Sequence, residues 1–110
     1  MVKRIEWSQT ATAELGQILT YLRFEVSYQT ALNFSELLQK QIDLLRTNRI
    51  EGRPVFNRKS VRFILLGKYH RLYYRRHGLT LYLARIYDTR QNPDSLPYRK
   101  RGNIGFPIRK

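Results

Sequence analysis

The apolar pattern changes its period between the two halves of the chain, and this change limits the possible folds more than any other feature. From residue 11 to 45, apolar side chains recur every three or four residues, which is typical of amphipathic helices. From residue 61 to 88, short apolar runs are separated by turns at Gly67 and Gly78, which is typical of antiparallel strands. The pattern therefore predicts an α+β fold.

Two serines mark the starts of the expected helices. Ser8 and Ser27 each precede an apolar stripe, and a serine side chain at this position accepts a hydrogen bond from a free backbone N–H. Only a tight corner at Val26 and Ser27 separates the stripes, so we expect an antiparallel helix hairpin. Its second helix is expected to end near Asn48. The stripes consist of Ala11, Leu15, Ile18, Leu19, Leu22 and Val26, and then of Ala31, Phe34, Leu38, Ile42 and Leu45.

The strands are expected at residues 1–7, 61–66, 69–75 and 80–88, with residues 48–60 as a loop. We therefore expect an antiparallel sheet, made of the N-terminal strand and a three-stranded meander, with the helix hairpin packed on one face.

Alternation along the middle strand of this meander predicts one apolar and one cationic face. Arg71, Tyr73 and Arg75 share one face, while the residues between them are apolar or aromatic and face the helices. In the next strand both alternating sets are apolar, so the pattern leaves the face of Arg85 open.

The positive charge lies almost entirely in the second half of the chain. The net charge is +13; residues 1–45 hold four basic and five acidic residues, whereas residues 46–110 hold seventeen and three. Such a field attracts nucleic acid or an acidic protein partner. A basic surface that serves only solubility is the alternative, but solubility does not require this segregation.

Several classes of protein are excluded or disfavoured. There is no cysteine, so neither a disulfide framework nor a thiolate metal site is available, and His70 and His77 alone do not make a metal site. Apolar runs are shorter than the roughly 20 residues of a membrane helix, and residues 1–10 do not resemble a secretory signal. We expect a cytoplasmic protein with one domain over residues 1–96 and a mobile basic tail over residues 97–110.

Two segments carry a resemblance to a known family. "YHRLYYR" in the middle strand and "IYDTRQNP" at the end of the last strand, in this order of elements, resemble the RelE/ParE superfamily of bacterial toxins from type II toxin-antitoxin operons. The resemblance covers about residues 1–96 and implies a curved antiparallel sheet with two helices on one side. RelE-like members cut mRNA on the ribosome without a metal, and ParE-like members inhibit DNA gyrase.

The resemblance also implies site residues. Arg71 and Arg90 match the two charge-stabilising arginines of the nucleases, and Arg62 falls where these carry a basic residue. Guanidinium groups suit this role because they stabilise the negative charge of a phosphoryl transition state. The match is incomplete, since Ile64 and Leu96 stand where the nucleases carry a lysine and a tyrosine.

Weaker candidates complete the site. Tyr73 and Tyr98 are possible acid/base groups, although packing is the simpler role for Tyr73, and His70 and His77 are expected at the surface near turns. Arg75 and Arg76 can equally be solvated charges, and Asp88 can pair structurally with Arg71 or Arg90. The full set predicted to bind a target or nucleic acid is Arg58, Lys59, Arg62, Arg71, Arg75, Arg85 and Arg90.

The first hypothesis is therefore a toxin neutralised by an acidic antitoxin, needing no cofactor and leaning toward ParE-like gyrase inhibition by binding. The alternatives are a RelE-like, ribosome-dependent and metal-independent mRNA endonuclease, and a basic RNA-binding protein without toxicity. Whether the chain is an enzyme is left open by the sequence.

Overall fold

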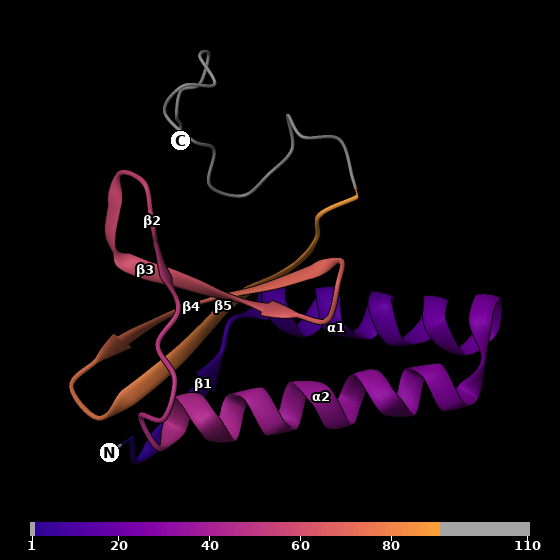
Figure 1. Cartoon of the computed structure of the whole chain (residues 1–110), viewed down its shortest axis with the longest axis horizontal. Coiled ribbons are helices and arrows are strands. Elements are labelled where there is room, and N and C mark those ends of the chain that lie inside the picture. The colour runs from indigo at the N-terminus through magenta and orange to yellow at the C-terminus, as the bar shows by residue number, and fades with distance from the viewer. Residues whose placement is uncertain (1, 91–110) are drawn as a thin grey trace.

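The computed structural model describes residues 2–90, which form two helices and a five-stranded sheet (Figure 1). The predicted tail, together with Tyr98 and Leu96, lies outside the described residues. The helices lie on one side of the sheet, so the α+β class and the packed helix hairpin are confirmed. The elements are β1 (Arg4–Trp7), α1 (Gln9–Tyr21), the π-helical turn η1 (Leu22–Val26), α2 (Tyr28–Arg46), β2 (Arg53–Val55), β3 (Arg58–Leu66), β4 (His70–His77) and β5 (Thr80–Asp88).

Both serines cap their helices as the sequence predicts. The Ser8 hydroxyl accepts a hydrogen bond of 2.9 Å from the N–H of Ala11, and the Ser27 hydroxyl accepts one of 3.0 Å from the N–H of Thr30. The Ser8 hydroxyl also donates to the carbonyl of Ala84 at 2.7 Å, which fixes the start of α1 to β5.

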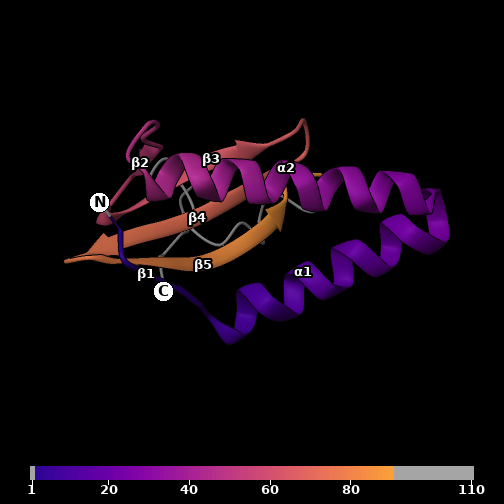
Figure 2. The same ribbon diagram turned by 90° about the horizontal axis from the view of Figure 1, so that it is seen from below.

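The first apolar stripe ends earlier than predicted. Leu22 still packs against the core, but Val26 is exposed. A π-helical turn holds more residues than an α-helical turn, so η1 rotates the residues after Leu22 out of the stripe. Figure 2 shows that this end of the hairpin extends beyond the sheet.

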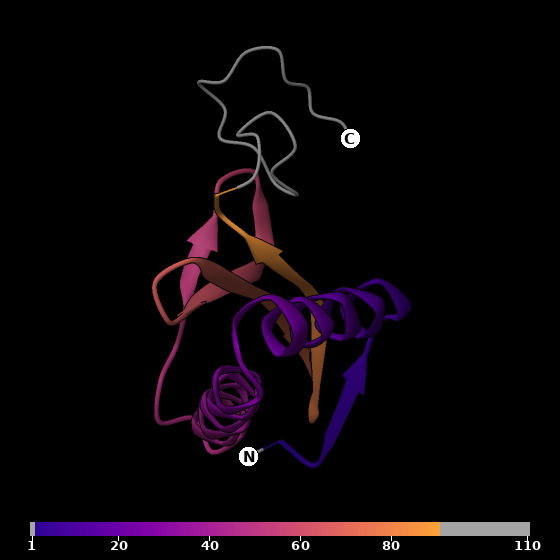
Figure 3. The ribbon, with the colours of Figure 1, turned by 90° about the vertical axis from the view of Figure 1, so that its right-hand side faces the viewer.

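The sheet has the order β1-β5-β4-β3-β2, and it differs from the expectation in two details. The N-terminal strand pairs parallel with β5, so the sheet is mixed rather than purely antiparallel. The residues predicted as loop contain β2 and the start of β3, which form a hairpin that rises away from the helices (Figure 3). Three residues are too few to show a period, and Pro54 is tolerated because β2 is an edge strand.

A bulge between β4 and β5 determines which side chains face the helices. Tyr73 pairs with Arg85 and Tyr74 pairs with Leu83, which leaves Ala84 as the extra residue. The bulge therefore lets Leu83 and Ile86 both reach the main core, and it explains why alternation in this strand was ambiguous. The main core consists of Val2, Phe34, Leu38, Ile42, Leu45, Ile64, Leu66, Leu72, Tyr74, Leu81, Leu83 and Ile86.

Glu14 joins α1 to the edge of β5 beyond the last β1 pair. Its carboxylate accepts a hydrogen bond of 2.8 Å from the N–H of Ile86 and bonds of 2.6 and 3.0 Å from the guanidinium of Arg85. The Glu14 side chain is only 18% exposed. The charge of Arg85 is therefore paired with that of Glu14 inside the domain.

Replacing Glu14 by Ala is expected to lower the free energy of unfolding by about 2 to 3 kcal/mol, because it removes charge-assisted hydrogen bonds to a partly buried carboxylate. Urea denaturation measures the change. The control is Glu36→Ala, an exposed glutamate of α2, with an expected change within about 0.5 kcal/mol. Equal changes in the two variants would contradict the structural role of Glu14.

Candidate functional site

The sheet face opposite the helices, here called the open face, carries arginines stacked on aromatic rings. The Arg71 guanidinium carbon lies 4.5 Å from the centroid of the Phe63 ring, and Arg71 Nη1 donates to the Tyr73 hydroxyl at 3.3 Å. The Arg75 guanidinium carbon lies 5.1 Å from the centroid of the Tyr82 ring. Stacking of this kind orients a guanidinium group without neutralising its charge.

Tyr73 lies beneath this layer and packs. It is 1% exposed and belongs with Val55 and Tyr87 to a second, smaller core on the open face. Buried in this way, the phenol offers little surface to a substrate, which favours the packing role over the catalytic one.

Arg62 does not share the open face with Arg71. Arg62 pairs with Tyr74, which faces the helices, whereas Arg71 pairs with Leu65, three residues further along β3. Side chains an odd number of residues apart on a strand point to opposite faces. The sheet therefore separates Arg71 from Arg62, the basic residue that the resemblance places in the same nuclease site.

Arg62 is also engaged by the segment before β2. Its Nε lies 3.2 Å from a carboxylate oxygen of Glu51, and its Nη1 donates to the carbonyl of Gly52 at 2.7 Å. Gly52 fits only as glycine, because an added Cβ would lie 2.3 Å from the carbonyl oxygen of Phe63. This close approach holds Glu51 beside Arg62.

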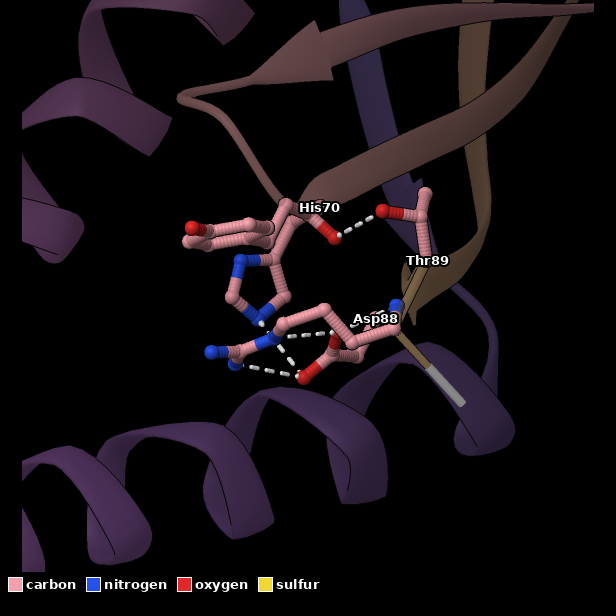
Figure 4. A network of polar contacts seen from close by, with 5 residues as sticks. His70, Asp88 and Thr89 are labelled. Atoms are coloured by element: carbon pink, nitrogen blue, oxygen red, sulfur yellow. Dashed lines mark hydrogen bonds and ion pairs between the residues drawn. The ribbon is translucent and has the colours of Figure 1, made fainter. Parts of the chain in front are cut away.

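Arg90 forms a network with Asp88 at the end of β5 (Figure 4). The backbone N–H and Nε of Arg90 donate to Asp88 Oδ1 at 2.8 and 3.1 Å, and Nη2 donates to Oδ2 at 2.8 Å. The guanidinium carbon lies 4.3 Å from the centroid of the Tyr69 ring. The Asp88–Arg90 pair is the structural alternative that the sequence suggested.

His70 completes this network from β4 and is a correction to the prediction. It was expected at the surface but is 8% exposed, because its ring packs edge-on against Phe34 with centroids 4.9 Å apart. Its Nε2 lies 3.9 Å from Asp88 Oδ2. His77 is exposed, as predicted.

The environment shifts the pKa values of the network. Burial lowers the pKa of His70, against the attraction of Asp88, while Arg90 adds a smaller lowering. The pKa of Asp88 is lowered chiefly by the side-chain hydrogen bond from Arg90, and the same bond raises the pKa of Arg90. A neutral imidazole beside an ion pair is therefore the stable state at neutral pH.

A cavity of about 290 Å³ lies between this network and α1. Because Arg90 lines this cavity together with residues of α1, Arg90 lies on the helix side of β5, whereas Arg71 lies on the open face. Its lining comprises Gln17, Ile18, Tyr21, Leu22, His70, Asp88 and Arg90.

The remaining predicted residues lie apart from one another. Arg58 and Lys59 begin β3 and Arg85 is bound by Glu14, whereas Arg71 and Arg75 present stacked guanidinium groups on the open face. Sequence reasoning missed Glu14. No local signal marks it, because its partners are more than 70 residues away.

The tip of the helix hairpin is the other prominent surface. Its most exposed apolar residue is Phe24, at 71%, and Arg23 stacks on the Phe24 and Tyr28 rings. A concentration of exposed aromatic side chains on a small domain is typical of an interaction site. The exposed set at this tip is Tyr21, Phe24, Val26, Tyr28 and Leu32.

No helix within residues 2–90 is long and apolar enough to cross a membrane. Over the same residues, no group of three or more His, Asp or Glu side chains could hold a metal ion.

A helix hairpin packed on one side of a five-stranded sheet is the architecture that the resemblance to RelE/ParE-type toxins implies. The model of one family, described as the ParE toxin of type II toxin-antitoxin system, parDE, matches residues 5–93. The chain belongs to this family, and the predicted membership of the RelE/ParE superfamily is confirmed.

Solved structures support the fold, although no curated protein matches the sequence significantly. A chain from the chromosomal ParDE toxin-antitoxin system of P. aeruginosa is 22% identical with a TM-score of 0.65, and the match covers 79% of this chain and 96% of that chain. A YafQ variant from E. coli is 16% identical with a TM-score of 0.57, and the match covers 80% and 96%. At these identities the likeness shows the fold.

Lowering the pH from 7 to 5 is expected to lower the free energy of unfolding. The unfolded His70 binds a proton near its ordinary pKa of 6.5, whereas the folded protein disfavours that proton, so stability is lost as the pH falls through the lowered pKa. The lowered pKa of Asp88 adds a further loss in more acidic solution, below about pH 4.

Urea denaturation between pH 7 and pH 5 tests this expectation. His70→Gln should flatten the pH dependence, and His77→Gln, which replaces an exposed histidine, should retain it. An unchanged dependence in His70→Gln would show that another group is responsible.

Proposed function

We propose that this type II toxin inhibits bacterial growth by binding DNA gyrase through its cationic open face, rather than by cutting RNA. The observation that carries the proposal is the separation of Arg62 from Arg71 by the sheet. A phosphoryl-transfer site needs its guanidinium groups around one phosphate, and here they lie on opposite faces.

The groups that would transfer protons support the same proposal. Tyr73 is buried, and His70 lies on the helix side in contact with Phe34. His77 is exposed but stands six residues from Arg71 along β4, about 20 Å at the rise of an extended strand. Arg71 thus has no proton donor or acceptor suited to cleavage among the candidates within residues 2–90.

One observation favours the mRNA endonuclease as a second candidate. Arg71 is held by Phe63 and Tyr73 in a fixed orientation on the open face, as a residue that stabilises a transition state would be. This candidate requires an acid or base from outside the described residues, such as Tyr98.

The proposed neutralising partner is an acidic antitoxin that covers the open face and the helix hairpin. The arginines of the open face would attract its carboxylates, and the exposed aromatic residues at the hairpin tip would be buried by its apolar side chains. The proposed location of the complex is the cytoplasm.

Expression in bacteria from a tightly repressed promoter separates the two candidate targets. Relaxed plasmid DNA or DNA breaks within minutes, while translation continues, is the expected result, because binding gyrase blocks DNA supercoiling first. Arg71→Ala should reduce this effect, and Arg23→Ala, an arginine outside the open face, serves as the charge-matched control. Rapid loss of translation with cut mRNA would contradict the proposal and support the endonuclease, and absence of any toxicity would point to a plain RNA-binding protein.

The affinity of the antitoxin is expected to fall when the salt concentration rises from 50 to 500 mM, because ions screen attraction between charged surfaces. Calorimetric titration of the toxin with its purified antitoxin measures the change. An affinity independent of salt would show that apolar contacts dominate and that the open face is not the electrostatic contact.

A further inference from the structure

A second group of arginines surrounds a small cavity at the rim of the sheet, which Arg71 does not line, although Arg75 does. The cavity has a volume of about 150 Å³ and lies where β3 and β4 meet the segment before β2. It is lined by Glu51, Ser60, Arg62, Tyr74, Arg75 and Arg76.

Arg76 has no counterion among residues 2–90. Its Nη2 donates to the carbonyl of Leu45 at the end of α2 at 2.6 Å, and its guanidinium carbon lies 5.5 Å from the centroid of the Tyr74 ring. Its Nε is buried, and it has no hydrogen-bond partner within the described part of the chain. A partly buried guanidinium group without a counterion is costly, because neither the carbonyl nor the ring neutralises its charge.

Arg62 brings a second cation to the same cavity. Because Arg62 pairs with Tyr74, Arg76 is its diagonal neighbour on the same face of the sheet, at roughly 7 to 8 Å between backbone positions. Glu51 is the ion-pair partner of Arg62, but its side chain is 63% exposed, and such a pair is weak.

Too little negative charge lies around the cavity to balance the guanidinium groups of Arg62 and Arg76. The lining residues include three arginines and one carboxylate, although the guanidinium of Arg75 stacks over Tyr82 on the open face. Like charges held close together cost free energy, and a bound anion would offset this cost. The Ser60 hydroxyl adds a hydrogen-bond donor to the lining.

We propose that this cavity binds a phosphate group, with the Arg62 and Arg76 guanidinium groups as its principal ligands and the Ser60 hydroxyl as a third donor. Guanidinium groups suit this ligand because their planar forks match phosphate oxygens in pairs. The same chemistry is offered by a nucleic-acid backbone and by free phosphate.

This site goes beyond the proposed function and does not depend on it. Its principal ligands, Arg62 and Arg76, lie on the helix side of β3 and β4, whereas the proposed gyrase surface is the open face. Phosphate binding is measured on the isolated full chain, so a failure of the gyrase proposal would leave it intact.

The test is a titration of the ¹⁵N-labelled full chain with inorganic phosphate, at constant ionic strength, following the arginine Nε–Hε signals by NMR. We expect saturable shifts for Arg62 and Arg76 and none for Arg23. Arg62→Gln should weaken binding at least tenfold, and Arg23→Gln should change it less than twofold. The wild-type signals test the site even if Arg76 variants, which lose the bond to α2, fail to fold.

Two further titrants identify the source of the phosphate. A short single-stranded oligonucleotide without terminal phosphates should shift the same two signals if a nucleic-acid backbone is the ligand, whereas inorganic phosphate alone will do so if the ligand is free phosphate. Either result supports the site. Linear shifts of all arginine signals alike, no loss of binding in Arg62→Gln, or a response only to a tetraglutamate peptide would overturn it.

Discussion

The extra residue Ala84 in β5 is the constraint on which the arrangement of this molecule depends. A shift of one residue in a strand moves every following side chain to the other face. Without the bulge, Leu83 and Ile86, which are three residues apart, could not both pack under the helices. With it, β5 contributes Leu81, Leu83 and Ile86 to the main core on the helix side and Tyr82, on which Arg75 stacks, to the open face.

The fold uses much of its positive charge internally. Arg62, Arg85 and Arg90 each pair with a carboxylate, and Arg76 holds the end of α2 through the Leu45 carbonyl. Arg71 and Arg75 instead lie on aromatic rings, where they keep their charge toward solvent or a partner. This arrangement is the basis of the proposal that the open face binds a target, because cleavage would need convergent groups.

The fold class could be predicted because it rests on local signals. Ser8 and Ser27 mark helix starts, and the change of period separates helices from strands. The parallel pairing of β1 with β5 could not be predicted, because the alternation of side chains is the same in parallel and antiparallel strands. The strand β2 could not be predicted, because its three residues are too few to show a period. The site was only partly predictable for a related reason. Residue types predicted the arginines as site candidates. The faces of Arg62 and Arg85, the burial of His70 and the role of Glu14 depend on register and on partners distant in the sequence.

The most direct test of the binding account compares the purified chain in two assays: supercoiling of relaxed plasmid by purified gyrase, and cleavage of an mRNA on purified ribosomes. The account predicts inhibition of gyrase that weakens in Arg71→Ala and no cleavage of the message. Cleavage at defined positions, lost in the same variant, with gyrase unaffected, would contradict it and show that Arg71 works with an acid or base beyond residue 90.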